Sequence, residues 1–187
     1  IIKNFSLPES DLWVVNNGIE EEIINYEKVD ESSMNLLYVS NLRQSKGVMD
    51  LIIIFSKLKE TYKNIILHIA GDFDAIEYEK KIKNIVQEKA LTDSIIFHGK
   101  VEGNNKDKLF QTCDLFLYPT HNDAMPLVLI ECMKYGLPFI AYDVGAIEEL
   151  AENGKNGITV QESDRETFHN EAVQLFCNKK HRLKLSK

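Results

Sequence analysis

The sequence predicts an α/β fold in which a parallel sheet carries helices on both faces. Short apolar runs, rich in β-branched and aromatic residues, alternate with longer segments of helical length. Glycines such as Gly71, Gly99 and Gly136 fall where these segments end. Strands that alternate with helices are typical of βαβ units, whose right-handed crossovers bring the carboxyl ends of the strands to one edge of the sheet.

The apolar runs and the helical segments set the expected elements in order. Strands are expected at 13–15, 35–40, 65–70, 94–98, 115–118, 138–142 and 158–160. Helices are expected at 48–60, 76–90, 105–111, 126–135, 146–152 and 165–177. The loops that follow the strands should therefore meet at the carboxyl edge of the sheet, where ligands bind in folds of this class.

The composition fits one globular domain and excludes several classes of function. The 187 residues are 44% hydrophobic, which is enough for one domain with its own core. The formal net charge of −7 argues against nonspecific binding of nucleic acid, which needs a basic surface. The cysteines show no CxxC spacing and the histidines no HxH or HExxH spacing, so we expect neither a metal site nor disulfides. This pattern, without any apolar run of membrane-spanning length, fits a cytoplasmic protein.

The segment 123–133 joins an apolar helix to two carboxylates. Glu131 stands in a helix that is apolar nearly all round, where an unpaired charge is expensive to bury. Its partner is a buried Lys or Arg, backbone N–H groups or a ligand hydroxyl. Pro126 suits the first helical position, and the remaining free N–H groups at that helix start then form an anion site. Asp123 either caps this helix or contacts a ligand.

The loop 40–47 follows the first strand of the sheet and opens a helix. It places Arg43 and Lys46 at the carboxyl edge, where a cation can neutralise a phosphate charge. The alternative is a solvated loop with surface cations. The loop carries neither a GxGxxG nor a P-loop pattern, so the common nucleotide fingerprints are absent. Gly145, in a later loop, either lets the backbone approach a ligand closely or simply turns the chain.

Several segments, taken in order, resemble the retaining, nucleotide-sugar-dependent glycosyltransferases of family 4. The resemblance covers nearly all of the chain, and the ordered set of motifs is specific. The matching pieces are Val15-Asn16-Asn17-Gly18-Ile19 ("pNGid"), Lys46-Gly47 (the end of "GRLxxxKG"), His68-Ile69-Ala70-Gly71-Asp72 ("ivGdG"), Phe97-His98-Gly99-Lys100-Val101 ("v.f.G.v"), Asp114 to Thr120 ("aDvfvlPS"), Asp123 to Glu131 (E-x7-E), Gly136-Leu137-Pro138 ("GlPvva") and Asn153 to Gly157 ("ngxnG").

The resemblance implies a GT-B architecture, in which two Rossmann-like domains enclose the active site. Residues 1–30 would be an inter-domain linker with a strand that leads into the next domain, and 31–187 the domain that binds the donor nucleotide sugar. The chain begins at Ile1 and reads as an excerpt of a larger protein. Because the acceptor would be held by the other, N-terminal domain, this chain alone is expected to bind the donor without transferring sugar.

The resemblance also implies roles for single residues. Glu131 would accept hydrogen bonds from ribose hydroxyls, Lys46 would contact the diphosphate, and Asp123 would face the donor sugar. Lys46 and Asp123 are thus the expected catalytic residues. The other expected nucleotide-binding residues are Asn41, Arg43, Gly47, Met125, Pro126, Leu127 and Val128. The family's loop arginine falls at Asn41, and the first motif glutamate is Asp123, shorter by one methylene.

The expected function is therefore donor binding for sugar transfer from a nucleoside-diphosphate sugar to an acceptor hydroxyl, in polysaccharide or glycolipid synthesis. No metal or other cofactor is expected, because positive charge and a helix dipole can stabilise the departing diphosphate. The full-length protein is expected in the cytoplasm, in peripheral contact with the inner membrane face. Three alternatives stay open: a nucleotide-sugar epimerase of the same fold, a flavodoxin-like receiver domain and a pure nucleotide-sugar binding module.

Overall fold

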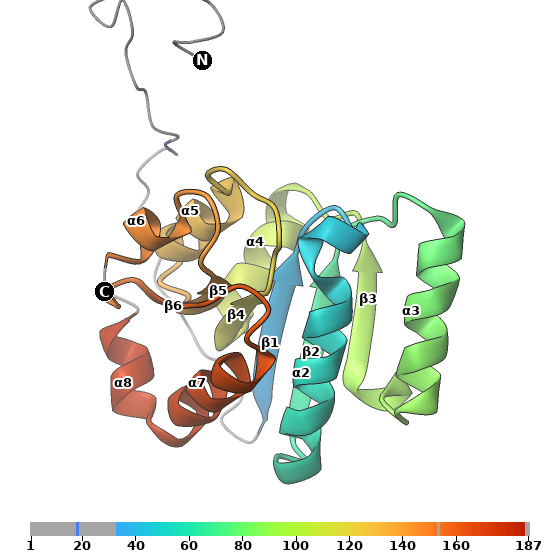
Figure 1. The fold of residues 1–187 in the computed structure, drawn as a ribbon. Helices are drawn as coiled ribbons and strands as arrows, with labels where there is room; N and C mark the ends of the chain where they lie inside the picture. Colours follow the sequence, from blue (N-terminus) through green and yellow to red (C-terminus); the bar gives the residue numbers. More distant parts are fainter. Residues whose placement is uncertain (1–17, 19–32, 153, 186–187) are drawn as a thin grey trace, which may run out of the picture.

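The computed structural model describes residues 18, 33–152 and 154–185, and its centre is a six-stranded parallel sheet (Figure 1). The strand order is β3-β2-β1-β4-β5-β6, with every neighbouring pair parallel. The strands are β1 (Met34–Val39), β2 (Ile65–Ala70), β3 (Ile95–Gly99), β4 (Leu115–Tyr118), β5 (Phe139–Tyr142) and β6 (Gly157–Val160). The predicted strand 13–15 and most of the predicted linker 1–30 lie outside the described residues.

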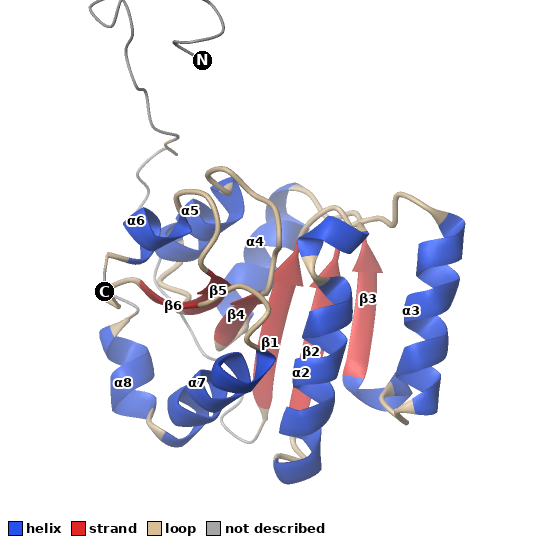
Figure 2. Cartoon of the chain, viewed as in Figure 1, coloured by secondary structure: helices blue, strands red, loops and turns tan. Residues whose placement is uncertain are grey.

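Helices cover both faces of this sheet, as the sequence predicts (Figures 1 and 2). The helices are α2 (Val48–Thr61), α3 (Ile76–Glu88), α4 (Gly103–Thr112), α5 (Leu127–Lys134), α6 (Ile147–Ala151), α7 (Arg165–Cys177) and α8 (Lys179–Lys184). One face carries α2, α3 and α7, and the other carries α4, α5 and α6. Two short 3₁₀ turns, η2 (Gln44–Lys46) and η3 (Thr92–Ser94), complete the described elements.

The core lies between these layers and is densest around the middle strands. β4 and β5 are buried along their whole length, because both of their faces are covered. Leu36, Leu37 and Tyr38 of β1 have no exposed surface. Burial on both faces explains why these strands appear in the sequence as short continuous apolar runs.

The start of α5 differs from the prediction. Pro126 was expected at the first helical position, but its φ of −73° and ψ of 118° make it the N-cap, and the helix begins at Leu127. The ring of proline fixes φ but leaves ψ free, so an extended ψ keeps the residue outside the helix. The Pro126 carbonyl still accepts the first hydrogen bond, from the Leu129 N–H at 3.1 Å.

Candidate functional site

A cavity of about 450 Å³ opens at the carboxyl edge of the sheet, where the loops after β1, β2 and β3 meet α4 and α5. Its lining comprises Val39, Ser40, Asn41, Ala70, Gly71, Lys100, Val101, Glu102, Gly103, Lys106, Asp107 and Glu131. Gly71 is one of these lining residues: it has a φ of 133°, and a Cβ there would lie 1.8 Å from the Ser40 carbonyl oxygen. Only glycine allows the ends of β1 and β2 to approach so closely.

Glu131 reaches this cavity from α5 and is paired there with a lysine of α4. The Lys106 Nζ lies 2.5 Å from Glu131 Oε1, and about a quarter of each side chain is exposed (27% and 26%). Of the partners that the sequence left open for Glu131, the structure thus supplies a cation. The pair is half-buried rather than sealed, so a ligand in the cavity can reach the carboxylate.

Lys106 was not among the site residues predicted from the sequence. It lies in the first half of α4, the helix that follows β3, and therefore close to the carboxyl edge. The available signal was a lysine near the start of a helix that follows a strand, because such a residue lies near the carboxyl edge where Glu131 needs a partner. Nothing in the spacing of the two residues along the chain pairs them, because they come from different helices.

A second ion pair joins the loop after β1 to the loop after β4. The Lys46 Nζ lies 2.6 Å from Asp123 Oδ2, and both side chains are less than one-fifth exposed (19% and 18%). Lys46 also donates to the Asn122 carbonyl at 2.9 Å. Asp123 Oδ2 accepts a further hydrogen bond, of 2.7 Å, from the hydroxyl of Tyr118 at the end of β4. The structure therefore brings together the two residues predicted to be catalytic.

Two glycines allow these loops to meet. Gly47 has a φ of 75°, and a Cβ there would lie 1.6 Å from the Pro119 carbonyl oxygen. Gly145 has a φ of 61°, and its Cβ would lie 2.1 Å from the Asp123 carbonyl oxygen. At both positions the close approach is to protein backbone, so each glycine has a packing role. The assignment of Gly47 to nucleotide binding stays a prediction.

The remaining predicted residues lie in different environments, and Pro126 is buried outside the cavity lining. Asn41 lines the cavity. The Arg43 side chain is 48% exposed, and its Nε lies 3.9 Å from Asp74 Oδ2, outside the cavity lining. Leu127 is 51% exposed. The side chain of Pro126, the N-cap of α5, makes no capping hydrogen bond to the first turn, which contains Leu127 and Val128.

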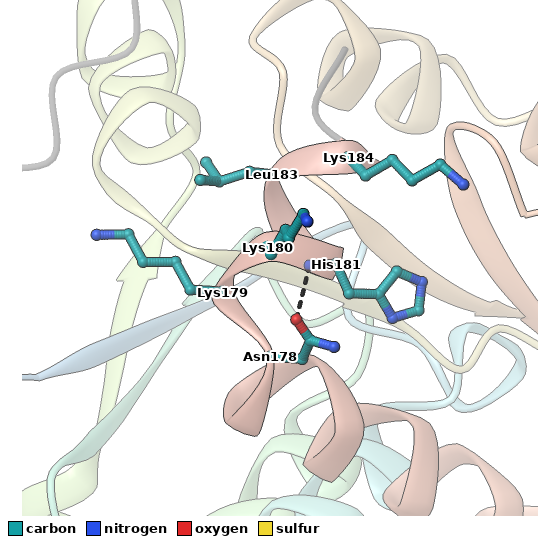
Figure 3. Close-up of a pocket in the computed structure, with 6 residues that line it drawn as sticks. All are labelled: Asn178, Lys179, Lys180, His181, Leu183 and Lys184. Atoms are coloured by element: carbon teal, nitrogen blue, oxygen red, sulfur yellow. Dashed lines mark hydrogen bonds between the residues drawn. The ribbon is translucent and has the colours of Figure 1, made fainter.

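A larger hollow, of about 810 Å³, lies along α8, away from the carboxyl edge (Figures 1 and 3). Its described lining residues are Asn178, Lys179, Lys180, His181, Leu183 and Lys184, all consecutive or nearly so in one short segment. Figure 3 shows their side chains spread in different directions, with the Asn178 side chain accepting a hydrogen bond from the His181 N–H. Functional groups from different elements do not converge here, so we take the smaller cavity as the candidate site.

Among the described residues, no group of three or more His, Cys, Asp or Glu side chains is arranged to hold a metal ion. In the same part of the chain, no helix has both the length and the apolar character required to cross a bilayer.

The family model described as "Glycosyl transferases group 1" matches residues 19–187. An uncharacterized glycosyltransferase of Methanocaldococcus jannaschii is 28% identical over 169 residues, which are 83% of this chain and 42% of the relative. N-acetyl-alpha-D-glucosaminyl L-malate synthase of Bacillus anthracis is 28% identical over 90% of this chain and 45% of the relative. The chain thus spans less than half the length of these curated relatives.

Solved structures share the fold. A mutant of S. aureus TarM, in a complex that includes UDP, matches with a TM-score of 0.82 and 18% identity, over 99% of this chain and 36% of that protein. Anabaena HepE in complex with UDP-glucose matches with a TM-score of 0.76 and 20% identity, over 83% and 42%. The C-terminal domain of a group 1 glycosyl transferase from Francisella tularensis matches with a TM-score of 0.74 and 20% identity, over 83% and 80%. These likenesses confirm the Rossmann-like fold of a GT-B domain, and with the family match over 19–187 they show that the chain belongs to the group 1 glycosyl transferases.

Proposed function

We propose that this chain is the donor-binding domain of a retaining glycosyltransferase of family 4. The full-length enzyme transfers a sugar from a nucleoside-diphosphate sugar to an acceptor hydroxyl. The observation that carries the proposal is the cavity at the carboxyl edge of the sheet. Glu131 of α5 lines this cavity and is paired there with Lys106. The solved relatives in complex with UDP or UDP-glucose support a nucleotide sugar as the ligand.

Glu131 binds the ribose in this proposal. Its Oε1 is held by Lys106, which fixes the side chain while Oε2 accepts from the ribose hydroxyls. A hydrogen bond to a charged group contributes about 1.5–3 kcal/mol, more than one between neutral groups. Lys106 also offsets the negative charge that Glu131 adds to a site meant for an anionic ligand. Asn41 and Gly71 also line the cavity, and the rest of the nucleoside binds there in this proposal.

The diphosphate is bound by Lys46 and by the backbone N–H groups of Met125, Leu127 and Val128, before and within the first turn of α5; Pro126, between them, has no N–H to donate. A helix N-terminus presents free N–H groups and a partial positive charge, so it suits a phosphate. Arg43 contributes less, because it is half exposed and lies next to Asp74. Asp123, at the outer end of the same segment, faces the donor sugar.

Catalysis then follows from charge placement at the leaving group. As the bond between the sugar and the diphosphate breaks, negative charge grows on the diphosphate, and Lys46 with the α5 N-terminus stabilises it. The acceptor hydroxyl comes from the N-terminal domain of the full-length protein. We propose polysaccharide or glycolipid synthesis as the setting, with the protein in the cytoplasm and in peripheral contact with the inner membrane face. We propose that no metal is needed.

The test is a thermal-shift and calorimetric screen of the chain against UDP, GDP, ADP and their sugars. A ligand at one hundred times its Kd stabilises the fold by about 2.7 kcal/mol, which a thermal shift detects. Glu131→Gln should then weaken nucleotide binding about tenfold or more, because the charge-assisted hydrogen bonds to ribose are lost.

The matched control is Glu88→Gln, at the far end of α3, which should leave affinity unchanged. The proposal fails if none of these nucleotides binds. It also fails if Glu131→Gln binds as tightly as the unchanged chain.

A further inference from the structure

Asp123 carries a feature that the proposed function does not explain. Its Oδ2 accepts from two donors at once, the Lys46 ammonium at 2.6 Å and the Tyr118 hydroxyl at 2.7 Å. Both contacts fall on the same oxygen, and Oδ1 therefore points elsewhere. A carboxylate that needed only an ion pair with Lys46 would have no use for a buried phenol aimed at the same atom.

Tyr118 is well placed to hold this carboxylate permanently. It ends β4 with 2% of its surface exposed, and its ring packs against Phe116 and Tyr38 at centroid distances of 5.7 and 6.0 Å. Burial, and next its hydrogen bond to Asp123, raises the pKa of Tyr118 well above its ordinary value. The hydroxyl is therefore a neutral donor throughout the physiological range.

Lys46, by contrast, can exchange its partner. Its backbone is fixed, because the Tyr38 hydroxyl donates to the Lys46 carbonyl at 2.7 Å. Its ammonium stands at the end of a flexible four-carbon chain with three rotatable donors. A diphosphate that binds in front of α5 competes with Asp123 for this ammonium, and its greater negative charge favours the exchange.

We propose that Tyr118 is a positioning residue of the donor site, which keeps Asp123 hydrogen-bonded when Lys46 turns to the diphosphate. This inference rests on the proposed function. Without the phenol, a mostly buried carboxylate would lose its remaining partner as the phosphate arrives, and an unsatisfied buried charge is costly. With the phenol in place, Asp123 keeps its orientation, and Oδ1 is available to a hydroxyl of the donor sugar.

The experiment compares a nucleoside diphosphate with its own nucleoside, using whichever of UDP, GDP and ADP binds most tightly to the chain. Calorimetry gives both dissociation constants for the unchanged chain and for Tyr118→Phe. The advantage of the diphosphate over the nucleoside should shrink about tenfold in Tyr118→Phe, because only the diphosphate draws Lys46 away from Asp123. Nucleoside affinity should stay the same.

Tyr142→Phe is the matched control. Tyr142 ends the neighbouring strand β5 and donates to Asp50 Oδ2 at 2.8 Å, which is the same kind of contact away from Lys46. Its removal should leave the ratio of the two dissociation constants unchanged. In an Asp123→Asn background, Tyr118→Phe should also have no effect on that ratio, because the carboxylate that it protects is gone.

The outcomes separate this inference from the proposed function. If the unchanged chain binds the diphosphate through Glu131 but Tyr118→Phe leaves the ratio unaltered, the inference is overturned and the proposed function stands. If no nucleotide binds, both are overturned. If Tyr118→Phe does not fold, Asp123→Asn decides: it should raise the relative affinity for the diphosphate by releasing Lys46, and an unchanged ratio overturns the inference.

Discussion

The two ion pairs of the site have nearly equal lengths but are built in different ways. Glu131 and Lys106, 2.5 Å apart, both stand on helices, α5 and α4, and face an open cavity. Asp123 and Lys46, 2.6 Å apart, both stand in or beside loops, and a tyrosine and two tight glycine contacts hold them. The first pair depends on regular secondary structure, and the second depends on how closely separate loops approach each other. The second should therefore be easier to break.

The largest expected effect comes from Gly47→Ala, which disturbs the loops that hold the Lys46–Asp123 pair. The new Cβ would lie 1.6 Å from the Pro119 carbonyl oxygen. The atoms that it meets, in Pro119 and Thr120, belong to the backbone and cannot move aside as a flexible side chain could. We expect a loss of about 3 kcal/mol or more in the free energy of unfolding, measured in urea, from the clash and the strained φ together.

Gly103→Ala is the control for this variant. Gly103 has a comparable φ of 53°, but a Cβ there meets nothing within 4 Å. Only the conformational strain remains, which costs about 1–2 kcal/mol. Equal losses for the two variants would show that the approach of Gly47 to Pro119 does not restrict the loops.

The next effect distinguishes the two lysines by ligand. Lys46→Ala should weaken binding of a nucleoside diphosphate about tenfold more than binding of its nucleoside, because we propose that Lys46 contacts phosphate. Lys106→Ala should weaken binding of both ligands to the same degree, because Lys106 is paired with Glu131, the proposed ribose-binding residue. Arg43→Ala should do less than either. Calorimetry with both ligands measures this, and matching ligand profiles for the two lysine variants would remove the distinction between the pairs.

The smallest expected effect concerns two histidines outside the candidate site. It tests whether the stability of the fold can change without a change in nucleotide affinity. His68 on β2 and His98 on β3 approach within 2.9 Å. Burial, and next the neighbouring His98, lowers the pKa of His68 to about 4. Because the unfolded chain binds a proton at about pH 6.5 and the folded chain does not, stability is full above that pH and falls as pH drops toward 4.

We expect a loss of about 1 kcal/mol across this range, reduced by the partial exposure of the ring. His68→Asn should flatten this pH dependence in urea unfolding and leave nucleotide affinity at pH 7 unaltered. An equally steep loss in the variant would assign the pH dependence to other groups.

Regular elements could be predicted from the sequence more reliably than contacts between elements. β2, β4 and α7 begin and end at the predicted residues, because burial on both faces or a clear apolar period fixed them. α8 was missed: its six residues are mostly basic, with no apolar stripe, although Asn178 is a typical N-cap and accepts from the His181 N–H at 2.9 Å. Lys106 was missed because its partner Glu131 comes from another helix and is close only in space. The role of Tyr118 was missed although Asp123 follows it by five residues, because an apolar strand does not show that the hydroxyl of its last residue turns toward the next loop.

The pairing of both lysines has a consequence for how a nucleotide arrives. An open cluster of cations projects a field into solution that draws anions in and quickens their association. Here each ammonium is already neutralised by a carboxylate within 2.6 Å, in a chain whose formal net charge is −7. Long-range attraction is therefore weak, so raising the ionic strength should not slow association. A nucleotide that binds at the proposed site should therefore arrive by ordinary diffusion and interact with these charges only at short range.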